Sequence, residues 1–275
     1  MTNFAKIAAL LAALLIGSAA ECLAAESPPI VVEIETPLAS THPLQGYLRQ
    51  PKSAAPSPAV VLLHSCNGNW KRIDERWGKL IASWGYVTLA VDSLGPRGLT
   101  NCGNTTPDGL ARDAYRALNF LVDEPSVDPA RVAVLGFAYG GGVALMSVER
   151  GSMEQTSSNK FRAAVAFYPP CSRFKGLMTV PTLILIGELD DWTPADECRK
   201  MVDGRDGWGI SRQERDGAPV KLIVYPGAYH AFDAPNPKNP IEGHHLEFNQ
   251  SARDQSSEAL REFLDATIGT KEQLP

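Results

Sequence analysis

The sequence predicts an α/β protein in which a doubly wound, mostly parallel sheet of about eight strands is flanked by helices. Short runs rich in Val, Ile, Leu and Ala alternate with amphipathic helical patterns from about residue 30 to the end. The inner runs are continuously apolar, as expected for parallel strands that are covered on both faces. The first two runs alternate more with polar residues and indicate an antiparallel edge. With 275 residues, of which 44% are hydrophobic, the chain can bury one large core.

The elements follow one another in a simple order. The expected strands are Ile30–Glu35, Gln45–Arg49, Ala59–His64, Tyr86–Asp92, Arg131–Phe137, Phe161–Phe167, Pro181–Gly187 and Val220–Tyr225. The expected helices are Asp74–Trp84, Pro107–Val122, Tyr139–Val148, Ala195–Val202 and Ser251–Thr267. The second helix has the clearest start, because Thr106 supplies a cap and Pro107 a first-turn proline ahead of an apolar face. Gly204–Gly217 and Pro235–His245 are expected as exposed loops.

The first 25 residues have the layout of a secretory signal peptide. Lys6 precedes an uncharged apolar run from Ile7 to Ile16, and small residues follow. We therefore expect residues 1–25 to be removed and residues 26–275 to form a single domain that is periplasmic or secreted. No later apolar stretch reaches the length of about 18 residues that a membrane span needs, so none is expected in the mature chain. A formal charge of −5 without a basic run argues against nucleic-acid binding.

Four cysteines remain after the signal segment: Cys66, Cys102, Cys171 and Cys198. An even number in an exported chain favours disulfides. We favour Cys66 with Cys102 and Cys171 with Cys198, because each pair joins loops that follow strands at the same edge of the sheet. Four buried free thiols are the alternative. The metal spacings CxxC and HxxxH do not occur, and neither a metal nor a cofactor is expected.

Residues Arg131–Gly142 read as an apolar strand, a glycine-flanked turn and a helix start. This is the layout of the G-x-S-x-G nucleophile elbow, in which a strained turn holds a Ser or Cys over the end of a sheet. Ala138 occupies the nucleophile's place and has no atom with which to attack. On its own, the glycine-rich turn also fits close packing of a helix on a strand.

Three further strand ends carry polar residues, and ligands of such sheets bind at strand ends. An acid at Asp190 and a base at His230 follow the elbow in the chain order nucleophile, acid, histidine. A histidine is needed to move the nucleophile's proton, and a buried carboxylate to orient it. The backbone amides of Cys66 and Tyr139 are the expected oxyanion donors. Each residue alone also fits a solvated loop, but their joint order favours a site.

These segments resemble the dienelactone hydrolase family, particularly its exported bacterial members, over roughly residues 30–268. The matching segments are Leu62–Gly68, Asp92–Gly98 with Cys102, the elbow, Phe167–Cys171, Gly187–Pro194 with Cys198, and Tyr225–Phe232. The resemblance implies an α/β-hydrolase fold without a large lid, a Ser or Cys nucleophile and a small ester or lactone as substrate. It assigns Asp190 as the triad acid and His230 as the base, with Asp191 and Glu188 as fallback acids.

Ala138 departs from the family pattern. Loss of a triad nucleophile costs on the order of a million-fold in kcat, so this copy is expected to be nearly inactive. The alanine fits an engineered nucleophile-to-alanine variant or a natural pseudoenzyme. A non-catalytic periplasmic protein that binds small molecules on the same scaffold is the main alternative, and a structural or partner-docking protein is a weaker one. A nucleophile relocated to Ser65 or Cys66 is disfavoured, because neither residue lies on the elbow.

Three side chains are candidates for substrate binding. Ser65 lies near the expected site, and Arg97 follows a strand end, where it can pair with a substrate carboxylate as a bidentate fork. An arginine that satisfies loop carbonyls is the alternative for Arg97. Trp192 is expected to wall an apolar pocket. The expected partner is a small-molecule ester or lactone, and the expected assembly is a monomer or weak dimer.

Overall fold

The computed structural model describes residues 28–35, 43–204, 217–235 and 240–269. The predicted signal segment, residues 1–25, lies outside the described residues, as do most of the Gly204–Gly217 loop and part of the Pro235–His245 loop. No helix in the described part of the chain is long and apolar enough to cross a membrane.

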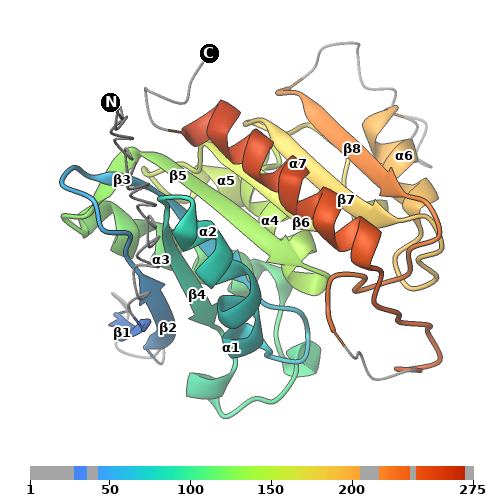
Figure 1. The fold of residues 1–275 in the computed structure, drawn as a ribbon, viewed down its shortest axis with the longest axis horizontal. Helices are drawn as coiled ribbons and strands as arrows, with labels where there is room; N and C mark the ends of the chain where they lie inside the picture. Colours follow the sequence, from blue (N-terminus) through green and yellow to red (C-terminus); the bar gives the residue numbers. More distant parts are fainter. Residues whose placement is uncertain (1–27, 36–42, 205–216, 236–239, 270–275) are drawn as a thin grey trace, which may run out of the picture.

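The core is one eight-stranded sheet (Figure 1). Its strands lie in the order β1-β2-β4-β3-β5-β6-β7-β8, and the pairs from β4 through β3 to β8 are parallel. β1 and β2 form the antiparallel edge, which confirms that prediction. The strands are β1 (Ile30–Ile34), β2 (Leu44–Arg49), β3 (Ser57–Leu63), β4 (Val87–Asp92), β5 (Val127–Phe137), β6 (Ala163–Phe167), β7 (Thr182–Gly187) and β8 (Val220–Tyr225).

Helices cover both faces of the sheet. On one face lie α1 (Trp70–Ile73), a π-helical turn (Asp74–Gly78), α2 (Lys79–Ser83) and α7 (Gln250–Ile268) (Figure 1). On the other lie α3 (Pro107–Asp123) and α4 (Tyr139–Val148), with α5 (Ser152–Gln155) packed against both. The remaining helix, α6 (Ala195–Val202), packs on β7, β8 and the 3₁₀ turn Cys171–Arg173. The inner strands are fully buried between these layers, as their continuous apolar runs predict.

Two predicted elements begin four residues earlier than expected, whereas the boundaries of the others agree within two residues. The helix expected at Asp74–Trp84 begins at Trp70 and contains a π-helical turn at Asp74–Gly78. Asp74 in this turn is buried and bound by Arg49 from β2, a distant contact that local spacing does not reveal. The strand expected to begin at Arg131 begins at Val127. Proline is rare inside strands, but Pro129 lies within this extended segment. The short helix α5 and the 3₁₀ turns were not predicted.

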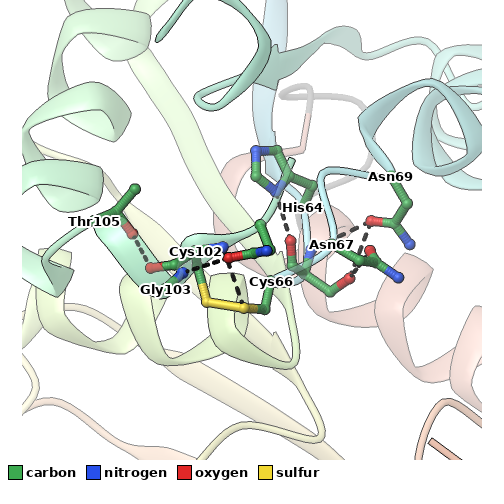
Figure 2. The surroundings of a disulfide bond; sticks show 9 residues. His64, Cys66, Asn67, Asn69, Cys102, Gly103 and Thr105 are labelled. Atoms are coloured by element: carbon green, nitrogen blue, oxygen red, sulfur yellow. Dashed lines mark hydrogen bonds between the residues drawn. A yellow bond between two sulfur atoms is a disulfide. The ribbon is translucent and has the colours of Figure 1, made fainter. Parts of the chain in front are cut away.

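The structure contains two disulfides, Cys66–Cys102 and Cys171–Cys198, so the favoured pairing is confirmed and the free-thiol alternative is wrong. The first joins the loop after β3 to the 3₁₀ turn Cys102–Asn104, which follows β4 (Figure 2). The second joins the turn after β6 to α6. Both therefore lie at the carboxyl edge of the sheet and tie its loops together.

Candidate active site

Ala138 lies at a sharp turn between β5 and α4. Its backbone has φ 49° and ψ −115°, a conformation that costs a non-glycine residue about 1–3 kcal/mol. The turn is held because Ala138 N donates to Phe167 O at 2.9 Å. Close packing explains the flanking glycines, since a Cβ at Gly136 would overlap the backbone of Gly140. The geometry is that of a strained strand-to-helix elbow, which presents the side chain of residue 138 at the sheet edge.

Asp190 follows β7, His230 follows β8, and their side chains meet. His230 Nδ1 lies 2.8 Å from Asp190 Oδ2, and both residues are buried. Asp190 Oδ1 also accepts the backbone N–H groups of Trp192 and Thr193 at 3.0 and 2.8 Å. Because the carboxylate accepts at Nδ1, the other ring nitrogen, Nε2, is left to accept a proton. That nitrogen has no hydrogen-bond partner among the described residues.

Thr193 is a member of this cluster that sequence reasoning missed. Its Oγ1 lies 2.9 Å from Asp190 Oδ2, 3.1 Å from Tyr168 O and 3.2 Å from His230 Nδ1. Its single hydrogen points to one of the two oxygens at a time. The one available signal was a hydroxyl residue three positions after the acid, a spacing that often closes a local turn. Thr193 therefore bridges the acid, the histidine and the end of β6.

A buried polar cluster supports the histidine from the core side. The ring of Tyr168 lies 4.7 Å from that of His230, and its hydroxyl donates to Asp233 Oδ1 at 2.7 Å. Trp77 Nε1 donates to the other Asp233 oxygen at 2.7 Å, and Arg76 forms an ion pair with it. Burial raises the pKa of Tyr168 well above its usual value, so its hydroxyl stays protonated and donates.

The two amides predicted as oxyanion donors lie on neighbouring segments. The β3–β5 register pairs Leu63 with Gly136, so the residues that follow leave the sheet side by side. A Cβ at Gly140 would overlap the carbonyl groups at the end of β3, which places the start of α4 against that strand end. Neither the Cys66 nor the Tyr139 N–H has an acceptor among the described residues. N–H groups without an acceptor at a sheet edge are the kind of donor that an oxyanion site uses.

The fallback acids have other partners. Asp191 accepts from His245 N, and Glu188 Oε2 accepts from Gly227 N at 3.0 Å. In the described part of the chain neither carboxylate is hydrogen-bonded to His230, so Asp190 is the one that contacts the histidine.

The three predicted substrate-binding side chains differ in their surroundings. Trp192 lies beside the histidine, with its ring 5.1 Å from that of His230. The Ser65 hydroxyl lies within hydrogen-bond distance of Asn67 Oδ1 and Asn69 Oδ1, at 2.7 and 3.1 Å.

The prediction for Arg97 needs correction. Its guanidinium binds both carboxylate oxygens of Asp113, at 2.6 and 2.8 Å, and also donates to Ser93 O. The fork predicted for a substrate carboxylate is thus occupied by a protein carboxylate. Arg97 ties the loop after β4 to α3, because Asp113 lies on that helix.

The sheet order, the elbow and the loops at its carboxyl edge define a protein with the α/β-hydrolase fold. The chain belongs to the dienelactone hydrolase family, whose model matches residues 44–268. A solved putative dienelactone hydrolase from Klebsiella pneumoniae subsp. pneumoniae MGH 78578 superposes with a TM-score of 0.66 at 17% identity, covering 86% of this chain and 99% of that one.

Two curated proteins with hydrolase names match part of the chain. It is 31% identical over 125 residues to Cutinase est1 of Thermobifida alba, a match that spans 42% of this chain and 37% of the cutinase. It is 23% identical over 210 residues to a probable 2-oxo-3-(5-oxofuran-2-ylidene)propanoate lactonase of Bradyrhizobium sp, covering 68% of this chain and 78% of that protein. The family and these relatives indicate a carboxylic-ester hydrolase scaffold.

Proposed function

We propose that the chain carries the active site of a hydrolase of small carboxylic esters or lactones with the nucleophile position occupied by Ala138. The observation that carries this proposal is the buried His230–Asp190 pair at 2.8 Å, which lies at the same edge of the parallel sheet as a strained elbow. Strained backbone conformations such as that of Ala138 are found mainly at functional sites, and presentation of a nucleophile is one such function. As it stands, the chain is expected to bind such ligands and to turn them over very slowly.

Each group has a defined role in the proposed reaction. A hydroxyl at position 138 would attack the ester carbonyl while His230 Nε2 takes its proton, and the histidine would return that proton to the leaving alcohol. Asp190 stabilises the imidazolium and holds the tautomer. The free N–H groups of Cys66 and Tyr139 bind the oxyanion of the tetrahedral intermediate. The acyl group is then bonded to the oxygen of residue 138. Water attacks it while His230 Nε2 takes a proton from the water, and the histidine returns that proton to the oxygen of residue 138 as the carboxylic acid leaves.

The substitution Ala138→Ser tests this proposal with p-nitrophenyl acetate and a small lactone as substrates. We expect kcat to rise by several orders of magnitude, up to about a million-fold, because the acyl-transfer step regains its attacking atom. The matched control is the double variant Ala138→Ser/His230→Ala, which should remain at the level of the alanine protein. No gain from Ala138→Ser in a folded protein would reject the hydrolase site.

The alanine itself favours a second function, binding without turnover, on the same scaffold. In that case the Ala138 protein binds a small ester or its acid product, and His230→Ala changes the affinity measured by calorimetry. Ala138→Ser would then leave ester hydrolysis at background. The two functions share the same residues and differ in the response to this one substitution.

We also infer an oxidising compartment, periplasmic or extracellular, as the place of function. Two disulfides and the N-terminal segment with the composition of a signal peptide support this inference. Intact-mass measurement of the protein exported from a Gram-negative host tests it. The expected mass lacks about 25 residues and four thiol hydrogens.

A further inference from the structure

We propose that His64 is a positioning residue that fixes the peptide group between Ser65 and Cys66 for oxyanion binding. The inference rests on the proposed function, because Cys66 N–H is an oxyanion donor only if the site binds a carbonyl compound. The Ser65 carbonyl and the Cys66 N–H belong to one planar peptide unit. A bond to the carbonyl therefore sets the direction in which the N–H points.

The contacts of His64 fix both its orientation and its tautomer. Nδ1 lies 2.6 Å from Ser65 O, and a carbonyl oxygen only accepts, so Nδ1 carries the hydrogen. Nε2 lies 3.3 Å from the backbone N of Ser93, which only donates, so Nε2 carries none. The Ser93 N–H, just after β4, thereby favours the neutral tautomer in which Nδ1–H donates to the Ser65 carbonyl.

Burial keeps this ring neutral. His64 is 6% exposed, and desolvation lowers its pKa from the usual 6.5, against smaller opposing effects of the Ser65 hydrogen bond and of Asp92 and Asp113. A proton added at Nε2 would face the Ser93 N–H. The histidine is therefore unsuited to proton transfer in the site and suited to a fixed donor role.

One further contact holds this peptide, and two others hold Cys66, the residue that carries its N–H. Gly68 N also donates to Ser65 O at 3.2 Å, which satisfies the second lone pair of this carbonyl. Cys102 N donates to Cys66 O at 2.9 Å, and the Cys66–Cys102 disulfide adds a covalent link (Figure 2). Two donors on the Ser65 carbonyl polarise the peptide and strengthen its N–H as a donor. That N–H is the group left without an acceptor among the described residues.

Two near-isosteric substitutions separate positioning from simple packing. In His64→Asn, the side-chain amide N–H takes the place of Nδ1–H and keeps the bond to Ser65. In His64→Gln, the side-chain oxygen takes the place of Nε2 and keeps the bond from Ser93. In the Ala138→Ser background, we expect His64→Asn to retain kcat for p-nitrophenyl acetate within about threefold. His64→Gln should lose about tenfold in kcat with KM unchanged, less than the 100- to 1000-fold cost of deleting an oxyanion donor. Equal losses, or the reverse order, would overturn the proposal.

A second readout uses the chain with Ala138 and needs no activity. Long-range ¹H–¹⁵N NMR should show His64 protonated on Nδ1 alone at neutral pH. The Cys66 amide proton should keep its chemical shift in His64→Asn and move upfield in His64→Gln. A ring protonated on Nε2, or a Cys66 amide that responds alike to both variants, contradicts the positioning role. If the Ala138→Ser protein shows no ester hydrolysis, the proposed hydrolase function is rejected. The NMR measurement then tests the role of His64 by itself.

Discussion

Gly140 and His64 are in backbone contact: a methyl group on Gly140 would overlap the His64 carbonyl oxygen. This contact joins the first turn of α4 to the loop after β3, the two segments that carry the free N–H groups of Tyr139 and Cys66. The alignment of these two donors therefore depends on a residue without a side chain.

The first prediction concerns this contact. Gly140→Ala should lower the free energy of unfolding by about 2 kcal/mol or more, because backbone rather than a flexible side chain must give way. Urea denaturation measures the loss. Gly151→Ala is the matched control, since its Cβ would meet only a carbonyl oxygen at 4.0 Å and its φ is extended. Equal stability of the two variants would show that the overlap is relieved at no cost.

The bridging hydroxyl of Thr193 gives a second prediction. In the Ala138→Ser protein, Thr193→Val removes the hydroxyl but keeps the shape, and kcat should fall by about tenfold because the His230–Asp190 pair loses an anchor to β6. Thr193→Ser keeps the oxygen and should retain most of the rate. Steady-state kinetics with p-nitrophenyl acetate compares them. If the Thr193→Val protein were as active as its parent, the Thr193 hydroxyl would have no role in catalysis.

The two disulfides should differ in their effect on the site. Their sequence separations of 36 and 27 residues imply a similar stabilisation of about 3–4 kcal/mol each on the chain-entropy model. Replacing either pair with alanines should lower the melting temperature, which calorimetry records.

Only the loss of Cys66–Cys102 should also reduce kcat in the Ala138→Ser protein, since Cys66 carries a proposed oxyanion donor. The Cys171/Cys198 pair is the control for stability alone. A loss of kcat that is the same for both pairs would mean that general destabilisation, not the oxyanion loop, is responsible.

The lowered pKa of His64 predicts a pH-dependent stability. The unfolded chain protonates this residue near pH 6.5, whereas the folded chain keeps it neutral to lower pH. The unfolded state therefore binds more protons in this range, and the free energy of unfolding should fall as pH drops below about 6.5. Urea denaturation at pH 7.5 and 5.5 measures the slope. His64→Asn lacks the titrating ring and should lose less stability over the same interval; parallel slopes would contradict the assignment.

Much of this architecture follows from local sequence pattern. Continuous apolar runs locate the inner strands, and the residues just beyond them supply Asp190, His230 and both cysteine pairs. What the sequence does not reveal are contacts between distant segments. Tyr168 and Trp77 both reach Asp233, over separations of 65 and 156 residues, and Arg49 binds Asp74 of the π-helical turn over 25 residues. Arg97 was misread for the same reason, because its partner Asp113 lies on a helix that packs beside its loop.

The central claim is that position 138 is the vacant nucleophile site of an otherwise assembled hydrolase. Paraoxon labelling followed by peptide mass spectrometry tests it most directly, since organophosphates phosphorylate an activated serine far faster than an ordinary hydroxyl group. We predict a stoichiometric phosphoryl adduct on the peptide that spans residue 138 in Ala138→Ser, none in the Ala138 chain, and none in Ala138→Ser/His230→Ala. An unlabelled Ala138→Ser protein, or an adduct on another residue, would contradict the account.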